Sequence, residues 1–116
     1  MSQSWTDVAE IGRTLPEVEE STWYGTEALK VRGKAMCRLR DDDETLVVRV
    51  LDLEDKEALL QANPDVLFTT PHYDGYAYVL VRLAAVERKL LAELIEDAWR
   101  CAAPQRLLAA HDADEA

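Results

Sequence analysis

The sequence predicts one α+β domain, in which helices pack on one face of an antiparallel sheet to make two layers. The chain has 116 residues, which is enough for a single hydrophobic core. Apolar residues make up 48% of it and charged residues 31%, a composition typical of a globular protein. Segments of helical and of strand periodicity follow one another in the order α-β(3)-α-β(2)-α. Because helices do not alternate singly with strands, we do not expect a parallel doubly wound sheet.

The first element is a helix expected over residues 4–15. Ser4 and Asp7 have the spacing of a capping box, and Pro16 ends the helix. The apolar residues of this segment recur at helical spacing: Trp5, Val8, Ile11 and Leu15.

Strands follow the first helix. Gly25 ends a short strand, and the pair Arg32-Gly33 marks a hairpin turn. Five strands are expected over residues 28–31, 34–40, 45–51, 66–69 and 76–83, and a short strand over 21–24 precedes them.

Two further helices complete the fold. Asp52 caps a helix that runs through Asn63. The longest helix covers residues 86–103 and has one apolar face, and residues 105–110 form a final turn. We therefore interpret residues 1–110 as a single domain and residues 111–116 as a disordered acidic tail.

Positive charge is concentrated in one segment of an acidic chain. Residues 28–40 contain five basic residues and no acid, a formal charge of +5. The whole chain carries −10, so the remainder carries −15. The basic residues alternate along the predicted strands, which places them on one face of the sheet. They are Lys30, Arg32, Lys34, Arg38 and Arg40.

The same alternation assigns the neighbouring residues to faces. Leu29, Val31, Ala35, Cys37 and Leu39 are expected to face the core, and Met36 to share the outer side with the basic residues. Tyr76, Tyr78 and Arg82 point outward in the last strand. The candidate nucleic-acid-binding residues are thus Lys30, Arg32, Lys34, Arg38, Arg40, Tyr76, Tyr78 and Arg82.

This basic face has two interpretations. Arginine, lysine and tyrosine together suit pairing with phosphates and stacking on bases. Charged residues also simply solvate the outer face of a two-layer sheet and discourage strand pairing at its edges. Charged residues on a protein surface are most often simply solvated, which favours the second interpretation. The absence of acids among the five basic residues makes the two interpretations less unequal without reversing their order.

No catalytic arrangement is visible. A histidine such as His72 could act as a general acid or base and Asp74 could orient it, but no nucleophile, metal ligand or second acid lies at a recognisable spacing. A turn set by Pro71, Asp74 and Gly75 explains this segment better. We therefore expect a protein that is not an enzyme.

Cofactors, metals and membranes are not expected either. The acidic turn 41–44 lacks the spaced ligands of a calcium loop, and the chain has no glycine-rich phosphate loop. Cys37 and Cys101 belong to no CxxC pair, which favours free thiols in a reducing cytoplasm. No apolar run approaches the ~18 residues of a membrane span.

Several short segments carry a family resemblance. They are Leu15-Pro16-Glu17-Val18-Glu19-Glu20 with Trp23-Tyr24-Gly25, the hairpin from Leu29 to Cys37, the turn and strand from Pro71 to Val79, and the helix ending in Ala102-Ala103-Pro104. In order and spacing, residues 4–110 resemble the MmcQ/YjbR-like family. The resemblance implies a small α+β fold akin to type III secretion chaperones, and it implies DNA binding, but it assigns no catalytic residues.

Two functional classes stay open at this stage. The first is binding of DNA through the basic face. The formal charge of −15 on the rest of the chain opposes it, unless that charge lies on the side of the protein away from the basic face. The second is a protein-interaction or dimerisation module with another protein or with a second copy as its partner. The resemblance favours DNA binding, and the protein-interaction module stays open as the alternative.

Overall fold

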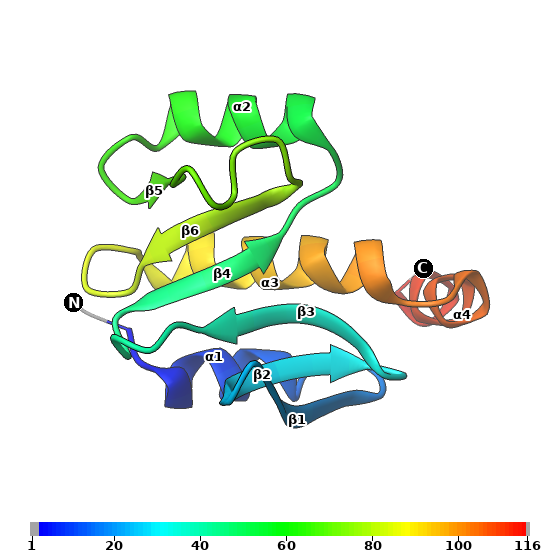
Figure 1. The fold of residues 1–116 in the computed structure, drawn as a ribbon. Helices are drawn as coiled ribbons and strands as arrows, with labels where there is room; N and C mark the ends of the chain where they lie inside the picture. The colour runs from blue at the N-terminus through cyan, green and yellow to red at the C-terminus, as the bar shows by residue number, and fades with distance from the viewer. Residues whose placement is uncertain (1–2, 116) are drawn as a thin grey trace.

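Six strands form one antiparallel sheet in the order β1-β2-β3-β4-β6-β5 (Figure 1). The structure is a computed structural model, and it describes residues 3–115. The strands are β1 (Val18–Trp23), β2 (Thr26–Val31), β3 (Lys34–Leu39), β4 (Thr45–Arg49), β5 (Leu67–Phe68) and β6 (Tyr78–Arg82). The expected α+β class and antiparallel sheet are confirmed, and the short first strand is a full edge strand.

Two helices cover one face of the sheet. Helices α1 (Trp5–Gly12) and α3 (Arg88–Ala102) lie on the same side of it in Figure 1, and α3 contacts β3 and β4. The main core lies between these helices and the sheet. It contains all nine residues that strand and helix periodicity best assign to an interior, each buried: Leu29, Val31, Leu39, Val48, Val79, Val81, Leu91, Leu94 and Ile95.

The other two helices pack at the margins of the core, through Leu59 and Leu60 of one and Leu107 of the other. Helix α2 (Leu53–Ala62) contacts β5 and β6, and Asp52 caps it by accepting a hydrogen bond of 2.8 Å from the Asp55 backbone N–H. Helix α4 (Gln105–Glu115) follows α3. Residues 111–115, expected to be a disordered tail, are therefore helical, and Ala116 lies outside the described residues. Among residues 3–115, no helix has the length and apolar character needed to cross a membrane.

A β-bulge alters the expected faces of β3. Leu29 pairs with Cys37, but Lys30 pairs with Ala35, so Met36 is the extra residue in the ladder. Met36 and Cys37 are consequently both buried in the core, although they are neighbours in a strand. The expectation that Met36 faces outward with the basic residues is wrong, because a bulge reverses the alternation on one side of it.

The hairpin expected about Arg32-Gly33 is present. Both residues have positive φ, 48° and 81°, and they connect Val31 to its cross-strand partner Lys34. Two consecutive residues of positive φ are typical of a type I′ turn, which matches the twist of the strands it joins.

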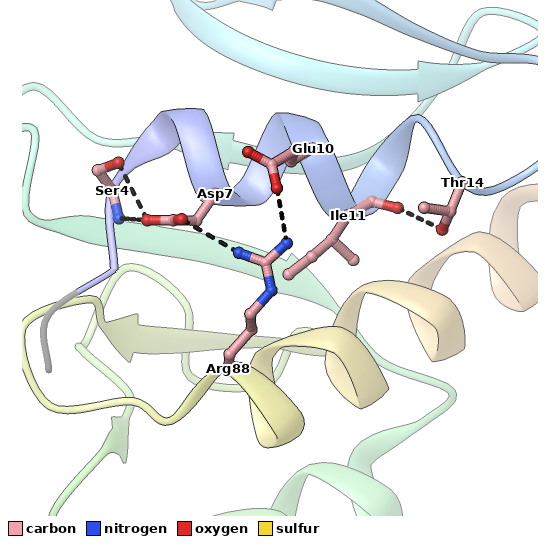
Figure 2. A network of polar contacts seen from close by, with 6 residues as sticks. All are labelled: Ser4, Asp7, Glu10, Ile11, Thr14 and Arg88. Carbon is pink, nitrogen blue, oxygen red and sulfur yellow. Dashed lines mark hydrogen bonds and ion pairs between the residues drawn. The ribbon is translucent and has the colours of Figure 1, made fainter.

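An ionic network fixes α1 against the start of α3. Arg88 donates to Asp7 at 3.1 Å and to Glu10 at 3.0 Å, and Figure 2 shows how these three side chains face one another. Asp7 also accepts a hydrogen bond of 2.8 Å from the Ser4 backbone N–H, as the capping box predicts. This backbone hydrogen bond, together with Arg88, holds the pKa of Asp7 below its usual value.

We predict that Asp7→Asn lowers the melting temperature at neutral pH by a few degrees and has little effect in acid. A carboxylate whose pKa is lowered by folding stabilises the fold above its unfolded pKa and loses that contribution as the pH falls through its folded pKa. Thermal unfolding of both proteins between about pH 7 and pH 2 measures the difference. Asp65→Asn, which removes an exposed carboxylate in a turn, is the control. A difference that is the same at every pH would contradict this role.

Candidate functional site

The opposite face of the sheet carries a pocket walled by aromatic side chains. Its volume is about 550 Å³, within the range of small-molecule sites. We call it the aromatic pocket, and its lining residues are Trp23, Tyr24, Arg38, Val47, His72, Tyr73, Tyr76 and Tyr78.

The register of three strands brings the floor of the pocket together. Arg38 of β3 pairs with Val47 of β4, and Val47 pairs with Leu80 of β6. Directly paired residues share a face, so all three lie on the side away from α1 and α3. Tyr78 stands two residues before Leu80 and therefore on the same face. Val47 and Leu80 are buried, which shows that this face is covered rather than fully solvated.

The turn between β1 and β2 supplies one wall under backbone strain. Tyr24 and Gly25 have φ of 55° and 79°, and they join the paired residues Trp23 and Thr26. A left-handed conformation costs a residue with a side chain about 1–2 kcal/mol, and turns of this type favour asparagine before glycine. Tyr24 is nevertheless 77% exposed, so burial does not explain its presence. Strain of this kind is concentrated at binding sites.

The loop between β5 and β6 supplies the opposite wall. Thr70 accepts hydrogen bonds from the backbone N–H groups of Tyr73 and Asp74, and the Tyr76 N–H donates to Tyr73. These turns direct Tyr73 and Tyr76 to the pocket. Tyr76 is 62% exposed, an unusual placement for a large aromatic residue.

A buried lysine holds this loop in place. Lys56 is the buried residue of α2 and is only 5% exposed. Its Nζ donates to the backbone carbonyl oxygens of Tyr73, at 2.7 Å, and Tyr76, at 2.9 Å. Burial lowers the pKa of Lys56 below its usual value, while the carboxylate of Asp74 opposes that shift. The ammonium group thus joins α2 to both tyrosines of the loop.

The aromatic rings form a continuous series of contacts around the pocket. Trp23 stacks on Tyr24 with centroids 5.1 Å apart, and its centroid lies 6.5 Å from that of Tyr78. Tyr78 is 6.1 Å from Tyr73, which meets His72 edge to face at 4.8 Å. These distances are in the range of favourable aromatic pairs, so the walls support one another.

Arg38 connects the two walls. Its Nη2 donates to the Tyr73 hydroxyl at 2.8 Å, and its Nη1 makes a longer contact of 3.4 Å with Thr26. The guanidinium carbon lies 5.5 Å from the centre of the Tyr24 ring. Among the described residues, no carboxylate lies within ion-pair distance of Arg38. A half-buried positive charge that only neutral groups contact favours binding of an anion.

A smaller hollow adjoins the pocket and shares Arg38 with it. Its volume is about 270 Å³, and it is lined by Arg38, Arg40, Asp41 and Asp42. We call it the arginine hollow. Asp42 is fixed there, because it accepts hydrogen bonds from the backbone N–H groups of Glu44 and Thr45 and from the Thr45 hydroxyl.

The structure brings together only some of the candidate residues from the sequence. Arg38, Tyr76 and Tyr78 line the aromatic pocket, and Arg40 lies in the adjoining hollow. The parity of the strands and the position of the tyrosines before the last strand predict this grouping.

The other four candidates lie elsewhere. The guanidinium of Arg32 makes two hydrogen bonds of 2.9 Å to Glu17, and Lys30 stands opposite Glu19 across the β1–β2 pair. Lys34 pairs with the core residue Val31, so the bulge leaves it off the outer face.

Arg82 occupies the far end of β6 from Tyr78. Its guanidinium carbon lies 4.1 Å from the centre of the Phe68 ring, the distance of a cation–π contact. Arg82 is thereby engaged with β5 and contributes nothing to the lining of the aromatic pocket.

Sequence reasoning missed four residues of the site. Trp23, Tyr24, Tyr73 and Lys56 were assigned no binding role. A signal was nevertheless present, because aromatic residues occur beside glycine in two turns, at Tyr24-Gly25 and at Gly75-Tyr76. Lys56 gave no signal, since a lysine in a helix is ordinarily exposed.

Both cysteines have the character of free thiols. Cys37 is fully buried, which raises the pKa of its thiol to about 12, and burial also raises the pKa of Cys101. Raised pKa values disfavour the reactive thiolate. Within residues 3–115, no group of three potential ligands is arranged to hold a metal ion.

A family model called YjbR matches residues 13–101. The chain belongs to the YjbR family. The resemblance seen in the sequence is thereby confirmed. The whole aromatic pocket lies within the matched region, since its lining residues all fall between 23 and 78.

Relatives of this YjbR chain share its length. Uncharacterized proteins of Mycobacterium tuberculosis and Mycobacterium bovis are 40% identical over 121 residues, covering 92% of this chain and 94% of theirs. A crystal structure of a Deinococcus radiodurans protein with the family domain DUF419 superposes with a TM-score of 0.71 at 24% identity. That match covers 84% of this chain and 77% of the other, and it shows a common fold.

We predict that Lys56→Met loosens the loop that carries Tyr73 and Tyr76. Two backbone carbonyl groups lose a charged donor, which costs about 1.5–3 kcal/mol where nothing replaces it. Hydrogen exchange should accelerate at the backbone amides of residues 73–76 and stay unchanged in β4. Lys89→Met, at an exposed position of α3, is the control. Uniform acceleration across the sheet would indicate a general loss of stability instead.

We also predict that Tyr24→Asn does not lower the melting temperature. Asparagine tolerates the left-handed conformation better than tyrosine, which offsets the lost stacking on Trp23. Thermal unfolding of the variant beside Thr22→Asn, at an exposed position of β1, measures this. A clear fall in melting temperature would show that Tyr24 is retained for stability.

Proposed function

We propose that this protein is a non-enzymatic binding protein for single-stranded DNA and that the aromatic pocket is its binding site. The observation that supports this most is the half-buried guanidinium of Arg38, which has no carboxylate partner among the described residues and is surrounded by aromatic rings. Aromatic faces stack on bases irrespective of sequence, and arginine pairs with phosphate.

The shape of the site favours a single strand over a duplex. A base must present its flat face to enter between the turn at Tyr24 and the loop at Tyr76, and both faces of a base are covered in a stacked duplex. Tyr76 and Tyr78, the stacking residues expected from the sequence, line this space. The site therefore fits one unstacked base.

The charge of the chain limits the affinity. The net charge of −10 repels a polyanion, and several basic residues expected to help are engaged by other groups, such as Arg32 by Glu17. Arg38 and Arg40 are the two cations placed at the pocket and the arginine hollow. Each phosphate neutralised on a single strand contributes a salt slope of ~0.7, so the total slope should be small.

The test is a titration of labelled oligothymidine and of a length-matched duplex at low salt. We predict weak binding of the single strand, weaker binding of the duplex, and quenching of tryptophan fluorescence as a base stacks on Trp23. Arg38→Gln should weaken binding at least tenfold, because a charge-assisted hydrogen bond is worth about 1.5–3 kcal/mol. Tyr24→Asn should also weaken it, because each stacked base contributes about 1–3 kcal/mol.

Arg106→Gln is the matched control, since it removes the same charge from an exposed position of α4 outside the pocket. Glutamine is preferred to glutamate at position 38, because Arg38 is half-buried and bonded to Tyr73. Absence of binding, or binding that Arg38→Gln leaves unchanged, would reject the proposal and favour a protein partner.

A further inference from the structure

We propose that the site takes the end of a DNA strand, with the terminal base in the aromatic pocket and a terminal phosphate in the arginine hollow between Arg38 and Arg40. This inference rests on the proposed function and names the part of the strand that is bound.

The aromatic pocket and the arginine hollow adjoin each other and share one lining side chain. Arg38 lines both the aromatic pocket and the arginine hollow. Arg40 stands two residues further along the chain, and its backbone N–H donates to Thr45, so the β3–β4 pairing continues past the end of β3. The two arginine side chains therefore leave the same face of the sheet about 7 Å apart along the strand. A nucleotide places its phosphate one sugar away from its base, which matches a pocket beside a hollow.

The guanidinium groups of Arg38 and Arg40 form no ion pair among the described residues, although Arg40 attracts the Asp42 carboxylate at longer range. Arg40 is half-buried. Two guanidinium groups on one phosphate make several charge-assisted hydrogen bonds. A terminal phosphate carries more negative charge than an internal one, so it gains more from the pair.

Carboxylates close the path along which a strand would continue. Asp41 and Asp42 form the other side of the arginine hollow, and Asp43 and Glu44 follow them in an exposed turn. Burial raises the pKa of Asp42, but hydrogen bonds from Glu44 and Thr45 and the positive charge of Arg40 outweigh that effect and hold it below its usual value, so this carboxylate is charged at neutral pH.

Past the hollow, a second phosphate would meet Asp43 and Glu44 in the exposed turn. Like charges at close range are unfavourable, and neither of these two acids forms an ion pair within the described chain. On the loop side, Asp74 stands between Tyr73 and Tyr76. The site thus accepts one phosphate and repels its neighbours, which distinguishes a strand end from a strand interior.

The experiment compares oligothymidines of about ten nucleotides, a length within the range that single-strand sites cover. One has no terminal phosphate, one has a 5′-phosphate, one has a 3′-phosphate, and one is closed into a circle. We expect one of the phosphorylated strands to bind about tenfold more tightly than the unphosphorylated strand, and the circle to bind least. Thymidine monophosphate with its phosphate on the favoured position should displace the strand.

Variants of the protein separate the contribution of the terminal phosphate to the binding affinity from the contribution of the base. Arg40→Gln should abolish the preference for a phosphorylated end, so that phosphorylated and unphosphorylated strands bind with about the same affinity. The unphosphorylated strand should still bind. Lys34→Gln is the matched control, because Lys34 is exposed and lies outside both spaces. Asp41→Asn should raise the affinity of the circle by removing one repelling charge.

The outcomes distinguish this inference from the proposed function. A circle that binds as tightly as the linear strands, or no effect of either terminal phosphate, would overturn the inference and leave single-strand binding intact. Binding of the mononucleotide with no binding of any strand would reject the proposed function and keep the pocket and hollow as a nucleotide site. No binding of any of these probes would reject both.

Discussion

The site depends on one guanidinium. Arg38 stands on β3, donates to the Tyr73 hydroxyl at 2.8 Å, and faces the ring of Tyr24 at 5.5 Å. It therefore connects a turn and a loop that are distant in sequence, and it leaves its positive charge without a carboxylate among the described residues. In a partly desolvated space such a charge costs free energy unless an anion is supplied. The geometry of the pocket and the anion binding that we propose for it consequently have the same origin.

Two further unfavourable features occur at the same place. Tyr24 adopts a left-handed backbone conformation in a turn that asparagine would fit better, and Lys56 places its ammonium in the interior to hold two backbone carbonyls. Elsewhere the chain mostly follows the rules of stable folding, with an apolar core and a capping box on α1, although Glu17, Arg32 and Asp43 also have positive φ. Local departures from those rules that cluster at one pocket are typical of a binding site.

The sequence predicted the main features of the fold, because its apolar residues recur with the period of a strand in some segments and with the period of a helix in others. Alternation identified the core-facing residues of β2 and β6, and helical spacing identified the buried face of α3. The bulge at Met36 was not predictable in this way, since the choice between a regular ladder and a bulge depends on which pairing packs the core best. The helical conformation of residues 111–115 was also missed, because their acidic composition gives no periodic apolar signal.

What the sequence determined by itself was the class of fold, the interior of its strands, and a short list of outward cations and tyrosines. These follow from residue type and spacing, which act locally. The tertiary structure decided which of those residues meet. In the folded chain Arg32 forms an ion pair with Glu17, and Arg38 donates a hydrogen bond to Tyr73, 35 residues away. Such encounters depend on strand register and on where a loop returns to the sheet, and neither is encoded in any short segment of the chain.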